Sequence, residues 1–303
     1  MTDTTLTAPR PLSGILWMLA SGLSFVAVTG IVRYLGTDLP AAQSAFLRFA
    51  WGVVFLGPAL VALWRSGLPA GVWPMIAGRG AVHTVAVVCW FYAMARIPVA
   101  EVTAIGYLNP VLVTLGAALF FGERLAARRL IAIGVAVLGA LIVLRPGMRA
   151  VEPGHLAQIG AAAAFAGSYL FAKRLSQVMP AGAIVALMSA TVTIGLAPLA
   201  AAVWVPITWA QLGWLGLVAV FATAGHYCMT RAFTLAPIAV TQPVTFLQLV
   251  WATLLGAVVF GEAVDPFVLL GGAVIIAAIS YITWREAAIK RRSVTPPPGA
   301  GNL

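Results

Sequence analysis

The chain has 303 residues, of which 62% are hydrophobic and only 9% are charged, with a mean hydropathy of +1.01. A soluble domain carries about 25% charged residues, so this composition excludes a soluble globular protein and indicates that lipid surrounds much of the chain. The 18 Lys and Arg residues outnumber the 8 Asp and Glu residues, but they lie between apolar runs, which is typical of membrane orientation and not of nucleic-acid binding.

Apolar runs follow one another along almost the whole sequence. A membrane-spanning helix needs about 20 apolar residues, and continuous runs predict helices, whereas a membrane β-barrel would show alternating residues. The predicted fold class is an all-α membrane protein with ten transmembrane helices. They lie near residues 12–34, 41–63, 73–95, 99–121, 128–145, 155–174, 181–204, 211–233, 238–260 and 266–285.

The segments around these runs are expected to be short loops and tails. Residues 1–11 form an N-terminal tail, and residues 286–303 form a basic, Pro-rich tail that is expected to be disordered. The first run is too long for a cleavable signal peptide. Cys89 and Cys228 both lie inside apolar runs, so neither a disulfide, a metal site nor a cofactor is expected.

The basic residues predict the orientation in the membrane. If the N-terminus is cytoplasmic, only Arg33, Arg96, Arg145 and Arg149 lie in outer segments. Most of the others, among them Arg65 and Arg79, then belong to inner segments. Basic residues concentrate on the cytoplasmic side, so both termini are predicted to be cytoplasmic, in a cell inner membrane.

The chain also repeats itself at an offset of 139–140 residues. Uncommon residues recur at this offset. In the first part they are Pro40, Pro58, Cys89, Pro98 and Phe121-Gly122-Glu123, and their equivalents in the second part are, in the same order, Pro180, Pro198, Cys228, Pro237 and Phe260-Gly261-Glu262. The predicted units are residues 12–147 and 152–285. Each holds an odd number of spans, so the second enters the membrane inverted. Inverted repeats place a binding site near the midplane between the halves and allow alternating access, which indicates a carrier.

Several motifs then resemble the EamA branch of the drug/metabolite transporter superfamily. They are Leu47-Arg48-Phe49-Ala50, Tyr92-Ala93-Met94-Ala95, Asn109-Pro110, Phe121-Gly122-Glu123-Arg124-Leu125, Ile133-Gly134-Val135, Arg231-Ala232-Phe233 and Phe260-Gly261-Glu262. The second half has Gln248-Leu249 where the first has Asn109-Pro110. The resemblance implies an inverted 5+5 carrier with a central cavity formed mainly by helices 1, 3, 4, 6, 8 and 9. Relatives of this kind export aromatic and other amino acids, import S-adenosylmethionine, or export drugs and metabolites.

Thirteen side chains are candidates for the wall of this cavity, because they combine apolar rings with uncharged polar groups. They are Trp17, Ser21, Ser24, His83, Trp90, Thr103, Tyr107, Gln158, Phe165, Tyr169, His226, Gln242 and Phe246. For all of them helix packing or hydrogen bonding between helices is the alternative. His83 and His226 are predicted near mid-depth, where they would bind the solute or couple a proton, or else bond to a neighbouring helix.

The charged residues narrow the choice of cargo. All acidic residues lie in tails, loops or helix ends, which disfavours a carboxylate proton relay and a lipophilic-cation cargo. A phosphate cargo would require deep basic residues, and only Arg48 is available. We expect Arg48 to have a structural role.

The sequence therefore predicts a secondary transporter, not an enzyme, that moves amino acids or similar small metabolites, with export as the expected direction. The alternative cargoes are S-adenosylmethionine and drugs. A channel or an intramembrane enzyme is a weaker alternative, because neither a filter-like loop nor a catalytic constellation is found at depth. The expected partners are a small-molecule solute and the lipid bilayer, with a weak homo-oligomer left open.

Overall fold

The structure is a computed structural model that describes residues 11–121, 127–148, 150–175, 177–235 and 244–294. Within these ranges the regular secondary structure is helical and contains no β-strand, as predicted. The helices are α1 (Pro11–Leu35), α2 (Ala41–Phe55), α3 (Gly57–Ser66), α4 (Trp73–Met94), α5 (Val99–Gly106), α6 (Asn109–Phe121), α7 (Ala127–Leu144), α8 (Pro153–Leu175), α9 (Ala181–Ala202), α10 (Trp209–Leu235), α12 (Leu247–Phe260) and α13 (Pro266–Val294).

Six stretches of the described chain are long and apolar enough to cross a membrane. They comprise α1, α4, α9, α10, α13 and the combined stretch Val99–Gly116. A seventh span is counted if α2 and α3 cross together, whereas α7 and α12 contribute shorter apolar helices. Helix α8 is long enough but less apolar, because His155, Gln158 and Ser168 interrupt its Ala-rich sequence. The chain is therefore a multi-pass membrane protein.

Two of the predicted runs are broken helices. The run at 41–63 divides into α2 and α3, which meet at 64° just before Pro58. The run at 99–121 divides at Tyr107 and Leu108, just before Asn109-Pro110. Proline has no backbone N–H and disfavours the helical conformation of the residue before it, which explains both positions.

The ends of the last two runs also differ from the prediction. Helix α12 begins at Leu247, and residues 238–243 of the run predicted at 238–260 lie outside the described residues. Helix α13 continues to Val294, past the predicted end at 285, so its last turns extend into the segment predicted as a disordered tail.

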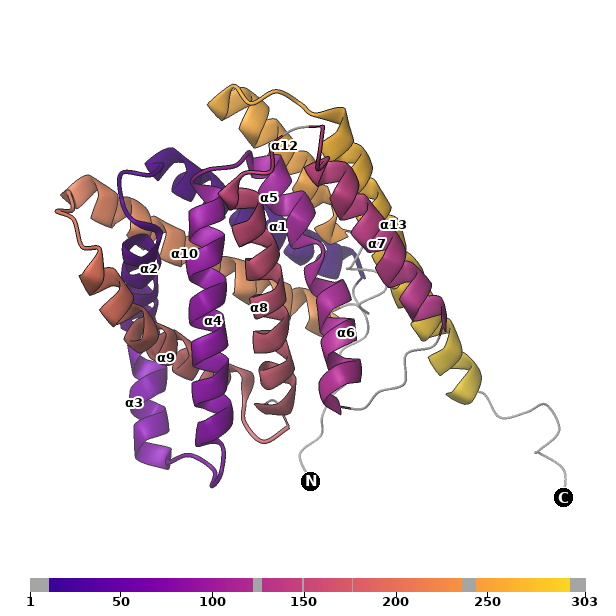
Figure 1. Cartoon of the computed structure of the whole chain (residues 1–303). Coiled ribbons are helices and arrows are strands. Elements are labelled where there is room, and N and C mark those ends of the chain that lie inside the picture. Colours follow the sequence, from indigo (N-terminus) through magenta and orange to yellow (C-terminus); the bar gives the residue numbers. More distant parts are fainter. Residues whose placement is uncertain (1–10, 122–126, 149, 176, 236–243, 295–303) are drawn as a thin grey trace, which may run out of the picture.

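The helices pack in pairs that join the two parts of the sequence. The most extensive contacts are those of α1 with α10, α4 with α8, α7 with α13, and α2 with α9. In Figure 1, α7 and α13 lie along one side of the bundle, α2, α3 and α9 lie on the other, and α4 and α8 stand between them. Every helix that the structure describes packs against at least one helix of the other part.

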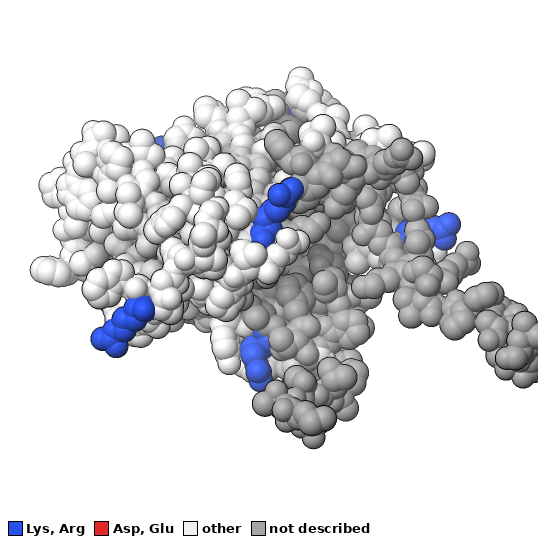
Figure 2. Space-filling model, turned by 90° about the horizontal axis from the view of Figure 1, so that it is seen from below, with Lys and Arg blue, Asp and Glu red and all other residues white. Residues whose placement is uncertain are grey.

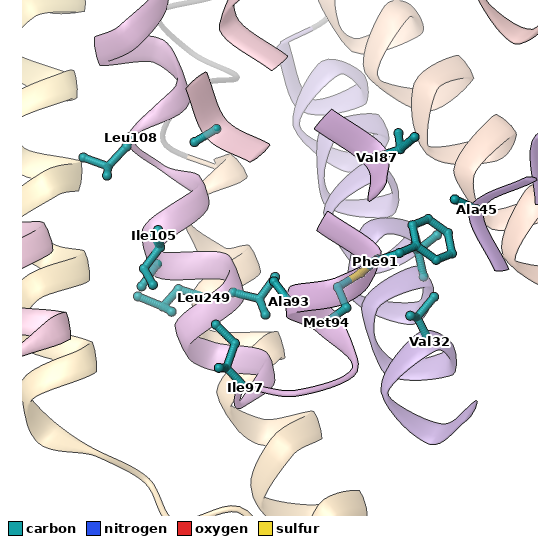
Figure 3. Close-up of a cluster of buried hydrophobic side chains, with 14 of the residues drawn as sticks. Val32, Ala45, Val87, Phe91, Ala93, Met94, Ile97, Ile105, Leu108 and Leu249 are labelled. Carbon is teal, nitrogen blue, oxygen red and sulfur yellow. The ribbon is translucent and has the colours of Figure 1, made fainter. Parts of the chain in front are cut away.

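The main apolar core draws residues from most of these helices. Phe91 of α4 is 1% exposed and lies with Val32 of α1 and Ala45 of α2, while Leu249 of α12 lies with Ile105 of α5 (Figure 3). Because lipid is as apolar as these side chains, close packing and not the hydrophobic effect must stabilise such contacts within the bilayer.

Glycines allow a close approach between α7 and α13. A Cβ atom placed on Gly271 would come within 2.5 Å of the carbonyl oxygen of Gly139, and one placed on Gly139 would come within 2.8 Å of the carbonyl oxygen of Gly271. The backbones of the two helices thus touch directly, as small residues permit in membrane proteins.

Candidate functional site

One group of predicted cavity residues forms, together with Phe49 of α2, an aromatic cluster between α4 and α8. We call Phe49, His83, Trp90, Phe165 and Tyr169 the aromatic cluster. Phe165 is its centre, because its ring lies 5.1 Å from that of His83, 5.8 Å from that of Trp90 and 6.4 Å from that of Tyr169. Phe49 of α2 meets His83 at 5.9 Å. Edge-to-face and stacked contacts of this kind suit a site for an aromatic or apolar group.

His83 supplies the polar group of the aromatic cluster. Its Nδ1 atom lies 2.9 Å from the hydroxyl oxygen of Ser168 in α8, and the side chain is buried. Spacing along α4 places His83 and Trp90 on the same face of the helix. The histidine thus bonds to a neighbouring helix, which was the alternative to its role in solute binding or proton coupling. The contact does not decide between these roles, because a hydroxyl partner can be exchanged for a solute.

A second group of predicted residues lies between α1 and α10. Trp17 packs edge-on against Tyr227 with ring centroids 5.9 Å apart, and His226 packs edge-on against Phe25 at 5.1 Å. The hydroxyl of Ser21 donates a hydrogen bond of 2.8 Å to the carbonyl oxygen of Gly225. The hydroxyl of Ser24 donates within its own helix, to Ala20.

The third group surrounds the break between α5 and α6. The Tyr107 hydroxyl donates to the backbone carbonyls of Thr245 and Phe246 at 3.3 and 3.4 Å, and the rings of Tyr107 and Phe246 meet edge-to-face at 5.6 Å. Thr103 donates to the carbonyl of Val99 in its own helix. Gln242, predicted beside Phe246, lies outside the described residues.

Gln158 connects this third group to α8. Its side-chain nitrogen donates to the carbonyl of Val102 at 3.0 Å, while its buried side-chain oxygen has no hydrogen-bond partner among the described residues. Asn109 makes a similar link by donating to the carbonyl of Ala162 at 3.1 Å. These amides satisfy carbonyls next to the helix break.

The predicted residues fill space instead of lining one open chamber. Two narrow cavities among the described residues lie elsewhere. One lies beside the first residues of α5 and the link from α12 to α13, and the other lies among α4, α8 and α9. None of the thirteen candidates lines either cavity. Their rings pack on one another, so this conformation presents the candidate site in a closed form.

Sequence reasoning missed a set of ion pairs at one end of the bundle. The side chain of Arg33 donates to Glu262 at 3.0 Å and to the carbonyl of Ala95 at 3.2 Å. Arg145 pairs with Asp265. Glu262 belongs to the doubled Phe-Gly-Glu motif, but its partner Arg33 lies 229 positions away in the sequence, so no local signal indicates the pair.

A third pair at this end joins His155 of α8 to Glu101 of α5. The Nε2 atom of His155 lies 2.6 Å from a carboxyl oxygen of Glu101, and both side chains are almost fully buried. The backbone N–H of Glu152 donates to Nδ1 of His155, so Nε2 carries the hydrogen that points to Glu101. The sequence offered only the position of Glu101 at a helix start, where the helix dipole favours an acid.

Comparison with known proteins places this architecture in a family. The sequence model of the EamA-like transporter family matches residues 12–145 and 152–284, once for each part of the chain. The chain is 29% identical to the pseudopaline exporter CntI of Pseudomonas aeruginosa over 88% of its length and 94% of that protein.

Other similar proteins carry different names. The chain is 27% identical to a riboflavin transporter of Vibrio cholerae, covering 93% of this chain and 97% of that one. It is 26% identical to an S-adenosylmethionine uptake transporter of Rickettsia bellii, covering 90% and 94%. A solved crystal structure aligns with a TM-score of 0.53 and 20% identity over 94% of this chain and 97% of its own, which supports the fold alone. The chain thus belongs to the EamA-like transporter family, a family of membrane transporters and not of enzymes.

Proposed function

We propose that this chain is a secondary transporter that moves amino acids or similar small metabolites across the inner membrane by alternating access, with export as its direction. The observation that carries the proposal is the aromatic cluster, in which rings surround the polar groups of His83 and Ser168 at an interface between α4 and α8. Sites for small organic molecules combine mostly apolar walls with a few placed polar groups.

We further propose an inverted 5+5 architecture of ten spans, with repeats at 12–147 and 152–285. The sequence offset makes α1, α4 and α7 the counterparts of α8, α10 and α13, and α2 with α3 the counterpart of α9. When each helix is replaced by its counterpart in the other repeat, the contact of α1 with α10 becomes the contact of α8 with α4. The contacts of α7 with α13 and of α2 with α9 each become themselves, because both members of each pair are counterparts. This exchange of packing partners is what a two-fold relation between the repeats requires.

The contact between Tyr107 and Phe246 supports the same relation. These two residues occupy equivalent positions in the repeats, and their rings touch. Residues that are equivalent and also in contact lie on the axis that relates two repeats. We therefore propose that the solute passes near this axis, in a chamber walled by the predicted residues when the halves separate.

Both termini are proposed to be cytoplasmic. Figure 2 shows the end of the bundle at which α3 ends and α4 begins, and within its described part Arg side chains are visible but no Asp or Glu. The residue Arg65, at the end of α3, is exposed there. A surplus of basic residues marks the cytoplasmic side of a membrane protein.

Counterflow in proteoliposomes tests the proposed function. Vesicles containing the purified chain and loaded with an unlabelled amino acid should accumulate the labelled amino acid transiently above its outside concentration, while protein-free vesicles should not. A panel of labelled amino acids identifies the cargo. Failure to exchange any amino acid, by protein that remains monodisperse, would reject amino acids as the cargo class.

The names of the relatives favour a second cargo class. Riboflavin and S-adenosylmethionine should be included in the same counterflow panel, because relatives of comparable identity are named for their transport. Exchange of one of these, without exchange of any amino acid, would favour that class. A channel would instead equilibrate the label without the transient accumulation that counterflow produces.

His83 and His226 have two alternative roles within the proposed function, proton coupling and solute binding. If His83 or His226 carries a coupled proton, His83→Gln or His226→Gln abolishes the pH dependence of uptake. If they only bind the solute, the same variants weaken its apparent affinity and leave the shape of the pH profile unchanged. Uptake measured from pH 5 to pH 8 with each variant separates the two roles.

A further inference from the structure

Two arginines lie inside the bundle without an acidic partner. Arg48 of α2 has a buried Nε atom and forms neither a hydrogen bond nor an ion pair with any described residue; its guanidinium lies 3.9 Å from the ring centre of Phe49. Arg79 of α4 is 7% exposed, and its buried Nε atom also has no partner. The sequence places Arg79 in an inner segment, and in the structure its side chain is buried among α4, α8 and α9.

Arg79 has one hydrogen bond, from a terminal nitrogen to the carbonyl oxygen of Ile184 at 3.2 Å. It also lines the narrow cavity among α4, α8 and α9, whose other lining side chains are apolar. One carbonyl does not satisfy the five N–H donors of a guanidinium. A buried cation with unsatisfied donors is costly within a membrane unless an anion or water completes its bonds.

Both arginines flank the aromatic cluster. Arg79 precedes His83 by four residues, which places the two on the same face of α4. Arg48 covers one ring of the cluster, that of Phe49, whose centre lies 5.9 Å from that of His83.

No acid of the described chain forms an ion pair with either of these two cations. Glu262, Asp265 and Glu101 are engaged at the opposite end of the bundle by Arg33, Arg145 and His155. Two like charges beside one aromatic site, without a counter-ion from the described residues, are suited to an acid group brought by the solute. A guanidinium binds a carboxylate through two parallel hydrogen bonds.

We propose that Arg48 and Arg79 bind the carboxylate of the solute and make the transporter selective for carboxylate-bearing molecules with an aromatic or apolar body. This inference rests on the proposed function, since it assigns a substrate class to the same site. The aromatic cluster contacts the body of the solute, and the arginines hold its acid group.

Binding of phenylacetate and of its uncharged analogue phenylacetamide tests the inference without requiring transport. The full chain in a non-ionic detergent should be stabilised against heat by phenylacetate and not by phenylacetamide. Arg48→Gln and Arg79→Gln should each weaken phenylacetate binding at least tenfold, whereas Arg65→Gln, at an exposed arginine of α3, should not change it. Arg48→Lys and Arg79→Lys retain the charge and should bind phenylacetate with intermediate affinity. These variants test the inference if a Gln variant does not fold.

The outcomes distinguish this inference from the proposed function. Carboxylate-selective, arginine-dependent binding without amino-acid counterflow would reject the amino-acid cargo and leave the carboxylate site standing. Three results would overturn the inference. They are equal binding of phenylacetate and phenylacetamide, no binding of either compound, and wild-type affinity for phenylacetate in both Gln variants. The arginines could also serve lipid phosphate. If phosphatidylglycerol in phosphatidylcholine nanodiscs stabilises the chain through the same arginines and blocks phenylacetate selectivity, the carboxylate site is overturned.

Discussion

Single residues decide how this helical chain satisfies polar groups away from water. Tyr107, Gln158 and Asn109 each bond to a backbone carbonyl on a different segment. The residue types of Tyr107 and Gln158 made them candidates from the sequence, whereas Asn109 was noted only as part of a motif. The partners of all three were not foreseeable, because pairing between distant segments depends on how the helices pack. The same limit applies to His155, which lies near a predicted loop and forms a buried pair with Glu101.

Removing His155 should destabilise the protein more than removing both members of its pair. His155→Ala leaves the Glu101 carboxyl group buried without its close partner, and such a loss costs about 3 kcal/mol. The double variant His155→Ala with Glu101→Gln should recover part of this stability, because no buried acid remains. Thermal unfolding in detergent measures both. Equal unfolding temperatures for wild type and His155→Ala would show that the pair contributes little.

The hydroxyl group of Tyr107 should contribute both to the stability of the protein and to the rate of transport. Tyr107→Phe keeps the contact with Phe246 but removes the hydrogen bond to the carbonyls at the start of α12, which we expect to cost about 1 kcal/mol of stability. Counterflow should also slow, because the residue lies at the proposed axis. Tyr34→Phe, at an exposed tyrosine of α1, is the matched control. If Tyr107→Phe unfolds at the wild-type temperature and exchanges solute at the wild-type rate, this contact has no role in transport.

The positions of the helices were easier to predict from the sequence than the contacts of individual side chains. Spans such as 73–95 and 12–34 coincide with α4 and α1 to within one residue at each end, because long apolar runs leave a membrane chain few alternatives. The breaks were less predictable. Pro58 and Asn109-Pro110 signal them locally, but the 64° angle between α2 and α3 arises from their packing against other helices.

The glycine contact between α7 and α13 gives an element-scale prediction. Gly271→Ala places a methyl group 2.5 Å from the Gly139 carbonyl oxygen, so the helices must separate. Overpacking of this kind costs about 1–3 kcal/mol. Gly134→Ala, also in α7, meets no atom within 4 Å and should be neutral or slightly stabilising, because alanine favours helices. Thermal unfolding should therefore rank Gly271→Ala below Gly134→Ala, and the reverse order would contradict this packing.

The whole molecule shows why the site was harder to predict than the fold. The repeat, read from a few uncommon residues, anticipated which segments correspond to one another. It did not show that the candidate residues fall into three packed groups, or that a second deep arginine borders one of them. Those features depend on the conformation, and here one end of the bundle is held together by Arg33–Glu262, Arg145–Asp265 and His155–Glu101.

If transport proceeds by alternating access, this end must open in each cycle. Arg33 belongs to the first half and Glu262 to the second, so a covalent link between their positions should hold the halves together. Arg and Glu side chains are too long for a direct disulfide to replace their contact, and a reducible bis-methanethiosulfonate cross-linker can span the gap. The background should carry Cys89→Ala and Cys228→Ala, which remove both native thiols.

Counterflow by the cross-linked Arg33→Cys/Glu262→Cys protein is the most direct test of the account. We predict that cross-linking stops exchange and that reduction restores it, while each single-cysteine variant is unaffected by the reagent. Full-rate exchange by protein shown to be cross-linked by mass spectrometry would contradict alternating access between the two halves.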